Sequence, residues 1–350
     1  MEQVKLTRAQ LDKMVEVPAQ THKVVGPKKK ATRYAFEEVK GPEEIEWGFD
    51  QTIQSPKAFF FPPVERLLKY SLSGAPDPEK TPVDERPVAI VGAHPCDINA
   101  TCLLDEAFSA SQNDPFYQAR REQSIMVGLD CVEPCDEMAF CKQMGTNVAK
   151  EKYDLLLTRS NGGYIAAVGS EKGKELLSKV GATEKAGQKE VDQAKQAKER
   201  GFQDCDVLKA RLEDLPQLLE DNVDHPVWEE IAERCFACGS CTMVCPTCYC
   251  FDVKDDPSLT MESAERWRRW DGCVLKGFAE VAGGEDFREH KADRLRHRFF
   301  RKGKYILERL GKPGCVGCGR CSRTCLAQIY AHETFNALTN AEEKAHERVS

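Results

Sequence analysis

The clearest pattern of hydrophobic positions lies between residues 88 and 129. Residues 88–92 form a short, continuous apolar run, and residues 124–129 form a second one. Between them, a loop that contains Cys96 leads to Asp97, which can cap a helix over the residues that follow. Short apolar runs separated by a helix are typical of buried parallel strands, so this region predicts an α/β sheet.

The pattern before residue 88 is mixed. The first 60 residues indicate both helix and strand, and the lysine run at 28–30 predicts a solvated loop. Residues 64–71 follow a double proline and show a short helix-like pattern, and the proline-rich, charged residues 74–87 predict a connector. Together these segments predict a mixed α/β fold for the amino-terminal part of the chain.

The pattern changes again after residue 150. Two apolar segments, 153–158 and 164–168, flank Asn161 and Gly162, which favour the tight turn of a β-hairpin. From about 183 to 234 the sequence becomes helical and strongly charged, so we place the change of domain in this stretch. The predicted domains are an α/β domain over residues 1–200 and an α-helical domain over residues 201–340.

Composition narrows the class of protein. The chain has 350 residues, which is enough for two domains or three, and its net charge of −7 argues against a protein whose main function is nucleic-acid binding. The amino terminus leads into a charged, helix-like pattern instead of a secretion signal, and no apolar run reaches the roughly 18 residues of a membrane-spanning helix. We therefore expect a cytoplasmic protein with no nucleic-acid partner and no membrane span.

Cysteine is the outlier of the composition, with 17 residues. Disulfides are not stable in a reducing compartment, so this excess indicates metal binding. Two segments share the spacing C-x2-C-x2-C-x3-C, which is typical of cubane iron–sulfur clusters; zinc is the alternative, but zinc sites favour pairs of CxxC or mixed Cys/His sets. The first run is Cys235, Cys238, Cys241 and Cys245, and the second is Cys315, Cys318, Cys321 and Cys325.

The spacing also predicts how the two runs share their thiolates. Three thiolates on one tight loop can reach three corners of a cube, whereas the fourth, on the helix that follows, points toward the neighbouring cluster. We therefore expect two [4Fe–4S] clusters, one held by Cys235, Cys238, Cys241 and Cys325 and the other by Cys315, Cys318, Cys321 and Cys245. The residues between the runs, 262–311, look mostly helical, which predicts an all-α ferredoxin-type domain.

Several longer segments then resemble one family. They are SPKAFFFPPVERLL, VGAHPCDINA, GLDC, FCKQMGTN, CPTCYCFDV, RWDGC, AGGEDFRE, RLRHRFF and CVGCGRC, in this order from about residue 55 to 330. Together they resemble the family of iron–sulfur subunits found in sulfhydrogenases (the beta subunit) and in anaerobic sulfite reductases, with relatives near heterodisulfide reductases. The resemblance implies a noncatalytic subunit of an anaerobic oxidoreductase complex. Such a subunit passes electrons between a flavoprotein subunit that binds FAD and NAD(P)H, or ferredoxin, and a catalytic redox subunit.

Four further cysteines lie in the α/β region. Cys96 and Cys131 follow the two predicted parallel strands, so both fall at the carboxyl edge of the sheet, where functional groups collect. With Cys135 and Cys141 they can hold a third [4Fe–4S] cluster, because a cluster needs only thiolates that converge from separate loops. The alternative is four buried structural cysteines. The family often has Cys-Phe-Cys where residues 139–141 are Ala-Phe-Cys, and Cys135 is expected to replace the missing thiol.

Other features leave more than one interpretation open. Cys248, Cys250 and Cys273 match the family pattern, and a fourth metal site, donors that raise the potential of a cluster, and simple packing are all consistent with them. The basic stretch 288–312 is either a solvated helix face, an offset for the negative charge of the clusters, or a docking face for an acidic partner.

The sequence also lacks the Gly-rich and Walker motifs of nucleotide sites, so we expect no nucleotide or flavin site on this chain. The main hypothesis is therefore an iron–sulfur electron-transfer subunit that works with a hydrogenase, sulfite reductase or heterodisulfide reductase type of catalytic subunit. The alternative hypothesis is that the chain itself reduces a sulfur substrate at an open thiol or cluster site.

Overall fold

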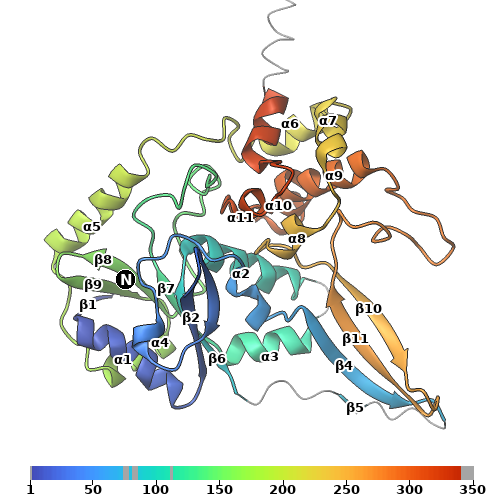
Figure 1. Ribbon diagram of the computed structural model, residues 1–350. Helices are drawn as coiled ribbons and strands as arrows, with labels where there is room; N and C mark the ends of the chain where they lie inside the picture. Colours follow the sequence, from blue (N-terminus) through green and yellow to red (C-terminus); the bar gives the residue numbers. More distant parts are fainter. Residues whose placement is uncertain (1, 74–78, 81–85, 111–112, 340–350) are drawn as a thin grey trace, which may run out of the picture.

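Two β-sheets and a helical carboxyl-terminal region make up the protein (Figure 1). The computed structural model describes residues 2–73, 79–80, 86–110 and 113–339. The larger sheet has the strand order β1-β9-β8-β7-β6-β2-β3. Its strands are β1 (Gln3–Leu6), β2 (Lys23–Lys30), β3 (Arg33–Glu38), β6 (Val88–Ala93), β7 (Ile125–Leu129), β8 (Leu155–Ser160) and β9 (Gly163–Val168).

The centre of the larger sheet is parallel and its edges are antiparallel. Strands β2, β6, β7 and β8 pair in parallel, so the predicted parallel arrangement of β6 and β7 is confirmed. The predicted hairpin is confirmed as well, because β8 and β9 pair antiparallel and Ser160 faces Gly163 across the Asn161-Gly162 turn. Gly162 has a φ of +92°, which this tight turn requires and which a residue with a Cβ rarely adopts.

Helices cover both faces of the larger sheet. One core joins the sheet to α1 and α4 through Leu11, Met14 and Leu176, and a second joins it to α2 and α3 through Ile98 and Tyr117. The result is a three-layer α/β region, as the hydrophobic pattern predicts. The helices of this part are α1 (Arg8–Ala19), α2 (Pro95–Ala107), α3 (Pro115–Gln123), α4 (Glu171–Lys179) and α5 (Gln188–Gly201), with two short 3₁₀ turns, η1 (Pro42–Glu44) and η2 (Pro56–Phe59).

The carboxyl-terminal region is mainly helical and has its own core. Phe140 and Met144, from the loop after β7, also pack into this core. The expected combination of a mixed α/β region and a helical cluster region is therefore confirmed, and the exact domain boundary near residue 200 stays a prediction. The helical elements are α6 (Leu215–Asp221), α7 (Val227–Arg234), α8 (Ser240–Met243), α9 (Lys291–Phe300), the π-helical turn η3 (Arg301–Tyr305), α10 (Ile306–Leu310), α11 (Arg320–Arg323) and a helix over 331–339.

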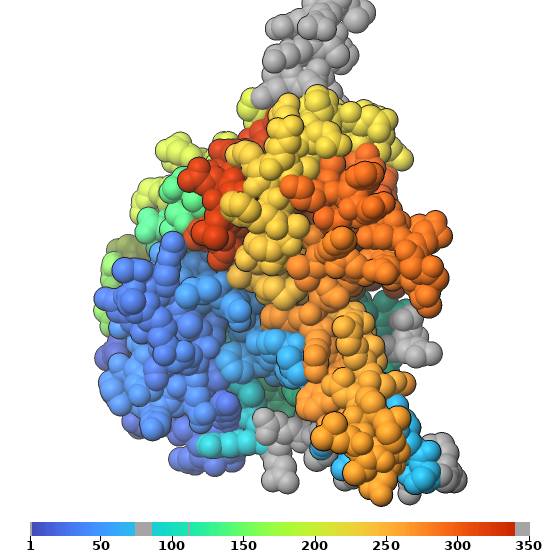
Figure 2. All heavy atoms as spheres, turned by 45° about the vertical axis from the view of Figure 1, so that its right-hand side comes forward, coloured from blue at the N-terminus to red at the C-terminus, as the bar shows by residue number. Residues whose placement is uncertain are grey.

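The second sheet was not expected from the sequence. It has the antiparallel order β10-β11-β4-β5, and Figure 2 shows its long hairpin extending from the body of the molecule. The helical prediction is wrong for β4 and β11, because the charged residues on them pair across strands instead of lining a helix face. One example is Arg66 on β4, which forms an ion pair of 2.8 Å with Glu265 on β11. The strands are β4 (Val64–Ser71), β5 (Glu79–Lys80), β10 (Phe251–Pro257) and β11 (Ser263–Trp270).

Three smaller expectations also need revision. The lysine run at 28–30 lies on β2 instead of a loop, where it pairs with the start of β3. Helix α2 begins at Pro95 with His94 as its N-cap, because proline fits the first helical position, so Asp97 is not the cap. Most of the connector 74–87 falls outside the described residues. In the part of the chain that the structure describes, no helix is long and apolar enough to cross a bilayer.

Candidate metal centres

The two cysteine runs fold into the same kind of loop. In each, the backbone N–H two residues after the first cysteine donates a hydrogen bond of 3.3 Å to the sulfur of that cysteine. Each loop then enters a one-turn helix, α8 in the first run and α11 in the second. The tight curvature comes from residues with positive φ at matching positions, which are Ala237 and Gly239 in the first loop and Gly317 and Gly319 in the second.

The structure brings together the thiols that the second predicted set contains. Cys315 interacts electrostatically with Cys321, Cys318 and Cys245, although Cys245 belongs to the first run. Of the other predicted set, Cys241 interacts with Cys235, and both border the same helical core as Cys325. The last member of that set, Cys238, is exposed at the surface.

These residues fit iron–sulfur clusters better than an isolated ion. The donors in both runs are thiols, which iron–sulfur clusters require, and the matching loops present three of them in the same way. Within the described residues, no group of three or more His, Cys, Asp or Glu side chains is arranged to hold a single metal ion. The four thiolates of a cubane bind four separate irons, so they do not converge on one point.

The four amino-terminal cysteines also converge. Cys96 lies in the first turn of α2, directly after β6, and Cys131 lies two residues after the end of β7. Cys131 interacts electrostatically with Cys135 and Cys141, and Cys96 interacts with Cys135. Burial raises the pKa of Cys135 to about 12 and that of Cys141 to about 11. These thiols are therefore protonated when no metal is bound, and metal binding is expected to release protons.

The amino-terminal cysteines lie against the second cysteine run. Cys318 interacts electrostatically with both Cys96 and Cys141. Cys96, Ala100, Val316 and Cys318 form one small apolar cluster between α2 and the second run. Sequence patterns did not indicate this contact, because the two segments are separated by most of the chain.

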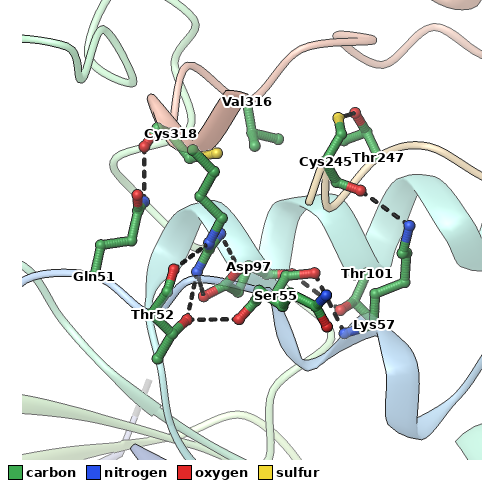
Figure 3. A network of polar contacts seen from close by, with 12 residues as sticks. Gln51, Thr52, Ser55, Lys57, Asp97, Thr101, Cys245, Thr247, Val316 and Cys318 are labelled. Carbon is green, nitrogen blue, oxygen red and sulfur yellow. Dashed lines mark hydrogen bonds and ion pairs between the residues drawn. The ribbon is translucent and has the colours of Figure 1, made fainter. Parts of the chain in front are cut away.

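A buried ion pair holds this junction together. Arg320 on α11 forms two hydrogen bonds with Asp97 on α2, of 2.7 and 3.0 Å, and both side chains are almost completely buried. Arg320 also donates a bond of 3.0 Å to the carbonyl of Thr52, and Gln51 donates one of 2.7 Å to the carbonyl of Cys318. Figure 3 shows Asp97, Thr52 and Gln51 grouped beside Cys318. The second cysteine loop is thus fixed to the α/β region by polar contacts as well as by packing.

Comparisons with known proteins agree with these centres. A family model described as a 4Fe-4S dicluster domain matches residues 234–329, which include both cysteine runs. The chain is also 34% identical to sulfhydrogenase 2 subunit beta of Pyrococcus furiosus over 315 residues, which cover 88% of this chain and 89% of that protein. This chain belongs to the sulfhydrogenase beta-subunit family. No solved structure matches it.

Membership of the sulfhydrogenase beta-subunit family identifies the chain as an iron–sulfur subunit of a sulfhydrogenase-type complex with [4Fe–4S] clusters. When bound, such a cluster accepts and donates single electrons. The two matching cysteine loops supply thiol donors of the kind that these clusters need.

A further group of thiols lies beside Cys245. A side-chain hydrogen bond between Cys245 and Cys248 lowers the pKa of Cys245 and raises that of Cys248. Cys248, Cys250 and Cys273 line one small cavity, so the structure brings together the three family-matching cysteines whose role the sequence leaves open. Near them, Lys57 donates hydrogen bonds to the carbonyls of Cys245, at 3.1 Å, and Cys248, at 2.9 Å. Figure 3 shows the first of these two bonds.

Gly317 tests how closely the second loop packs in this sulfhydrogenase beta-type chain. A Cβ at Gly317 would lie 2.6 Å from the backbone nitrogen of Cys141, whereas a Cβ at Gly311 would meet nothing within 4 Å. Both glycines have a positive φ, so Gly311→Ala is expected to cost only the backbone strain, about 1 kcal/mol. Gly317→Ala is expected to cost about 1–3 kcal/mol more, measured by anaerobic chemical unfolding. Equal costs for the two variants would contradict the close packing.

Proposed function

We propose that this chain relays electrons through three [4Fe–4S] clusters in a cytoplasmic anaerobic oxidoreductase complex. The proposed ligands of the amino-terminal cluster are Cys96, Cys131, Cys135 and Cys141. Those of the middle cluster are Cys245, Cys315, Cys318 and Cys321, and those of the outer cluster are Cys235, Cys238, Cys241 and Cys325. The observation that carries the proposal is the position of Cys318, which interacts with Cys96 and Cys141 on one side and with Cys245 and Cys321 on the other.

The same contacts give the relay an order. Cys241 of the outer set interacts with Cys321 of the middle set, so the three sets are neighbours in sequence from amino-terminal to middle to outer. At the outer end, Cys238 is exposed, and the neighbouring Phe236 has 69% of its surface exposed. An exposed thiol ligand beside an exposed aromatic side chain offers a place where a redox partner can approach.

The proposed partners are a flavoprotein subunit that binds FAD and NAD(P)H, or a ferredoxin, and a catalytic subunit of the hydrogenase, sulfite reductase or heterodisulfide reductase type. The relative from Pyrococcus furiosus is named as a subunit, which supports a role within a complex. The test is to purify the tagged full chain anaerobically with its native partners and to add NAD(P)H. The EPR signals of reduced clusters should appear in the complex and not in the chain alone. Reduction of the chain alone by NAD(P)H would contradict the proposal.

A second candidate function rests on one cavity. A cavity of about 150 Å³ lies beside Cys131 and Cys135 and is also lined by His94 and Arg159. Burial lowers the pKa of His94 to about 3, so its ring is neutral, and the ring nitrogen Nδ1 has no hydrogen-bond partner among the described residues. A small sulfur anion could bind there and be reduced by this chain itself. Turnover of sulfite or polysulfide by the isolated chain with reduced methyl viologen would favour this function, and no turnover would exclude it.

Cys135 is the ligand that tests the amino-terminal cluster. Cys135→Ser is expected to lower the iron content of the anaerobically purified chain by about four irons, because one cubane loses a ligand. The control is Cys102→Ala, since Cys102 is buried on α2 and is not in the proposed ligand sets. The iron content of the control should equal that of the unmodified chain. An unchanged iron content in Cys135→Ser would remove Cys135 from the ligand set.

A further inference from the structure

Three cationic side chains share one face at the junction of α9 and η3. Arg298, Arg301 and Lys302 are spaced at i, i+3 and i+4, which places them on the same side of a helix. Arg298 and Lys302 are buried, and Arg301 is partly buried. The π-helical turn η3 begins at Arg301, and such turns are rare and are found frequently at functional sites. This face therefore differs from the solvated helix face that the basic composition of 288–312 also allowed.

These side chains face the thiols around Cys245. Together with Cys248, Cys250 and Cys273 they line the same small cavity. The Nζ atom of Lys302 donates a hydrogen bond of 2.7 Å to Thr247 Oγ1, and that oxygen lies 3.2 Å from the sulfur of Cys245. The ammonium group of Lys302 is thus separated from a proposed ligand of the middle cluster by a single hydroxyl group.

No carboxylate balances these three cations within the part of the chain that the structure describes, because none of them forms an ion pair with an Asp or Glu there. The nearby arginines of the junction differ, since Arg320 is paired with Asp97 and Arg323 with Asp136. A buried cation without an anionic partner is costly, so its charge needs compensation from another source. The groups that face Arg298 and Lys302 are thiols, including Cys241, Cys245, Cys248, Cys315 and Cys321.

We propose that Arg298, Arg301 and Lys302 form a cation cage that gives the middle cluster the highest reduction potential of the three clusters. This inference rests on the proposed function. Reduction adds one negative charge, and fixed positive charges in a buried, low-dielectric site stabilise the reduced form more than the oxidised form. At the amino-terminal cluster the arginine charges are cancelled by Asp97 and Asp136, and at the outer cluster Cys238 is exposed to water, which screens charge. An electron that enters the chain therefore rests at the middle cluster.

The experiment is an EPR-monitored redox titration of the anaerobically purified full chain. Lys302→Gln removes the charge and keeps a hydrogen-bond donor for Thr247, and Lys302→Arg keeps the charge. The matched control is Lys304→Gln, two residues along η3, where Lys304 is paired with Glu308 at 2.8 Å and does not face the thiols. We expect a more negative midpoint potential for the first cluster to be reduced in Lys302→Gln, a potential close to that of the unmodified chain in Lys302→Arg, and no change in Lys304→Gln.

Each outcome has one meaning. Unchanged potentials in Lys302→Gln, at an iron content equal to that of the unmodified chain, would overturn the cation cage. If Lys302→Gln loses iron, Arg301→Gln decides, because Arg301 is only partly buried and interacts with Cys248 and Cys250. It should give a smaller shift in the same direction, and no shift would overturn the inference. An unmodified chain without iron–sulfur EPR signals would instead contradict the proposed function, so the two failures are distinguishable.

Discussion

Arg320→Ala is expected to lower the free energy of unfolding by about 3–5 kcal/mol, because it leaves the carboxylate of Asp97 buried without a partner. Both side chains of the pair are almost completely buried, and Arg320 also bonds to the backbone and side chain of Thr52. The substitution therefore removes the polar contacts between α2 and the second cysteine loop. Anaerobic unfolding in guanidinium chloride, followed by tryptophan fluorescence, measures this loss.

Arg269→Ala is the matched control for Arg320→Ala. Arg269 is also paired with an aspartate, Asp256, at 3.2 Å, but both side chains are about half exposed. An exposed pair contributes at most about 1 kcal/mol, so this variant should unfold close to the unmodified chain. If Arg320→Ala were no less stable than Arg269→Ala, the buried ion pair would not be what holds the junction.

Cys318→Ser is expected to remove the middle cluster and thereby interrupt the relay. The iron content should fall by about four irons, because Cys318 is a proposed ligand of one cubane only. The spectroscopic effect should be larger, since the amino-terminal and outer clusters would lose the neighbour that lies between them. The reduced variant should show EPR signals without the magnetic coupling of adjacent clusters.

The double variant Cys135→Ser/Cys318→Ser separates this interpretation from general unfolding. It should keep about four irons, which belong to the outer cluster, because the two substitutions affect different cubanes. Loss of all iron in Cys318→Ser alone would contradict independent ligand sets. Retention of all iron in that variant would contradict the assignment of Cys318 as a ligand.

The sequence predicted those parts of the molecule that depend on local spacing. The two C-x2-C-x2-C-x3-C runs, the parallel strands before Cys96 and Cys131, and the Asn161-Gly162 turn are each specified by neighbouring residues. The β11 strand was missed because its charged residues find their partners on β4 and β10, and β4 is far away in the sequence. Local patterns contain no information about such pairings.

The junction and the cation cage were beyond sequence reasoning for the same reason. Asp97 has the position of a helix cap in the sequence, yet its partner Arg320 lies 223 residues away. The spacing of Arg298 and Lys302 shows that they share a helix face, but only the tertiary packing shows that this face meets the thiols beside Thr247.

The relay and its order both depend on one chain holding three [4Fe–4S] clusters. Iron analysis combined with Mössbauer spectroscopy of the anaerobically purified full chain is the decisive measurement. We expect about twelve irons per chain, all with the parameters of [4Fe–4S] clusters. A value of about eight irons in a fully loaded chain would refute the three-cluster relay, because the amino-terminal cysteines would then hold no cluster.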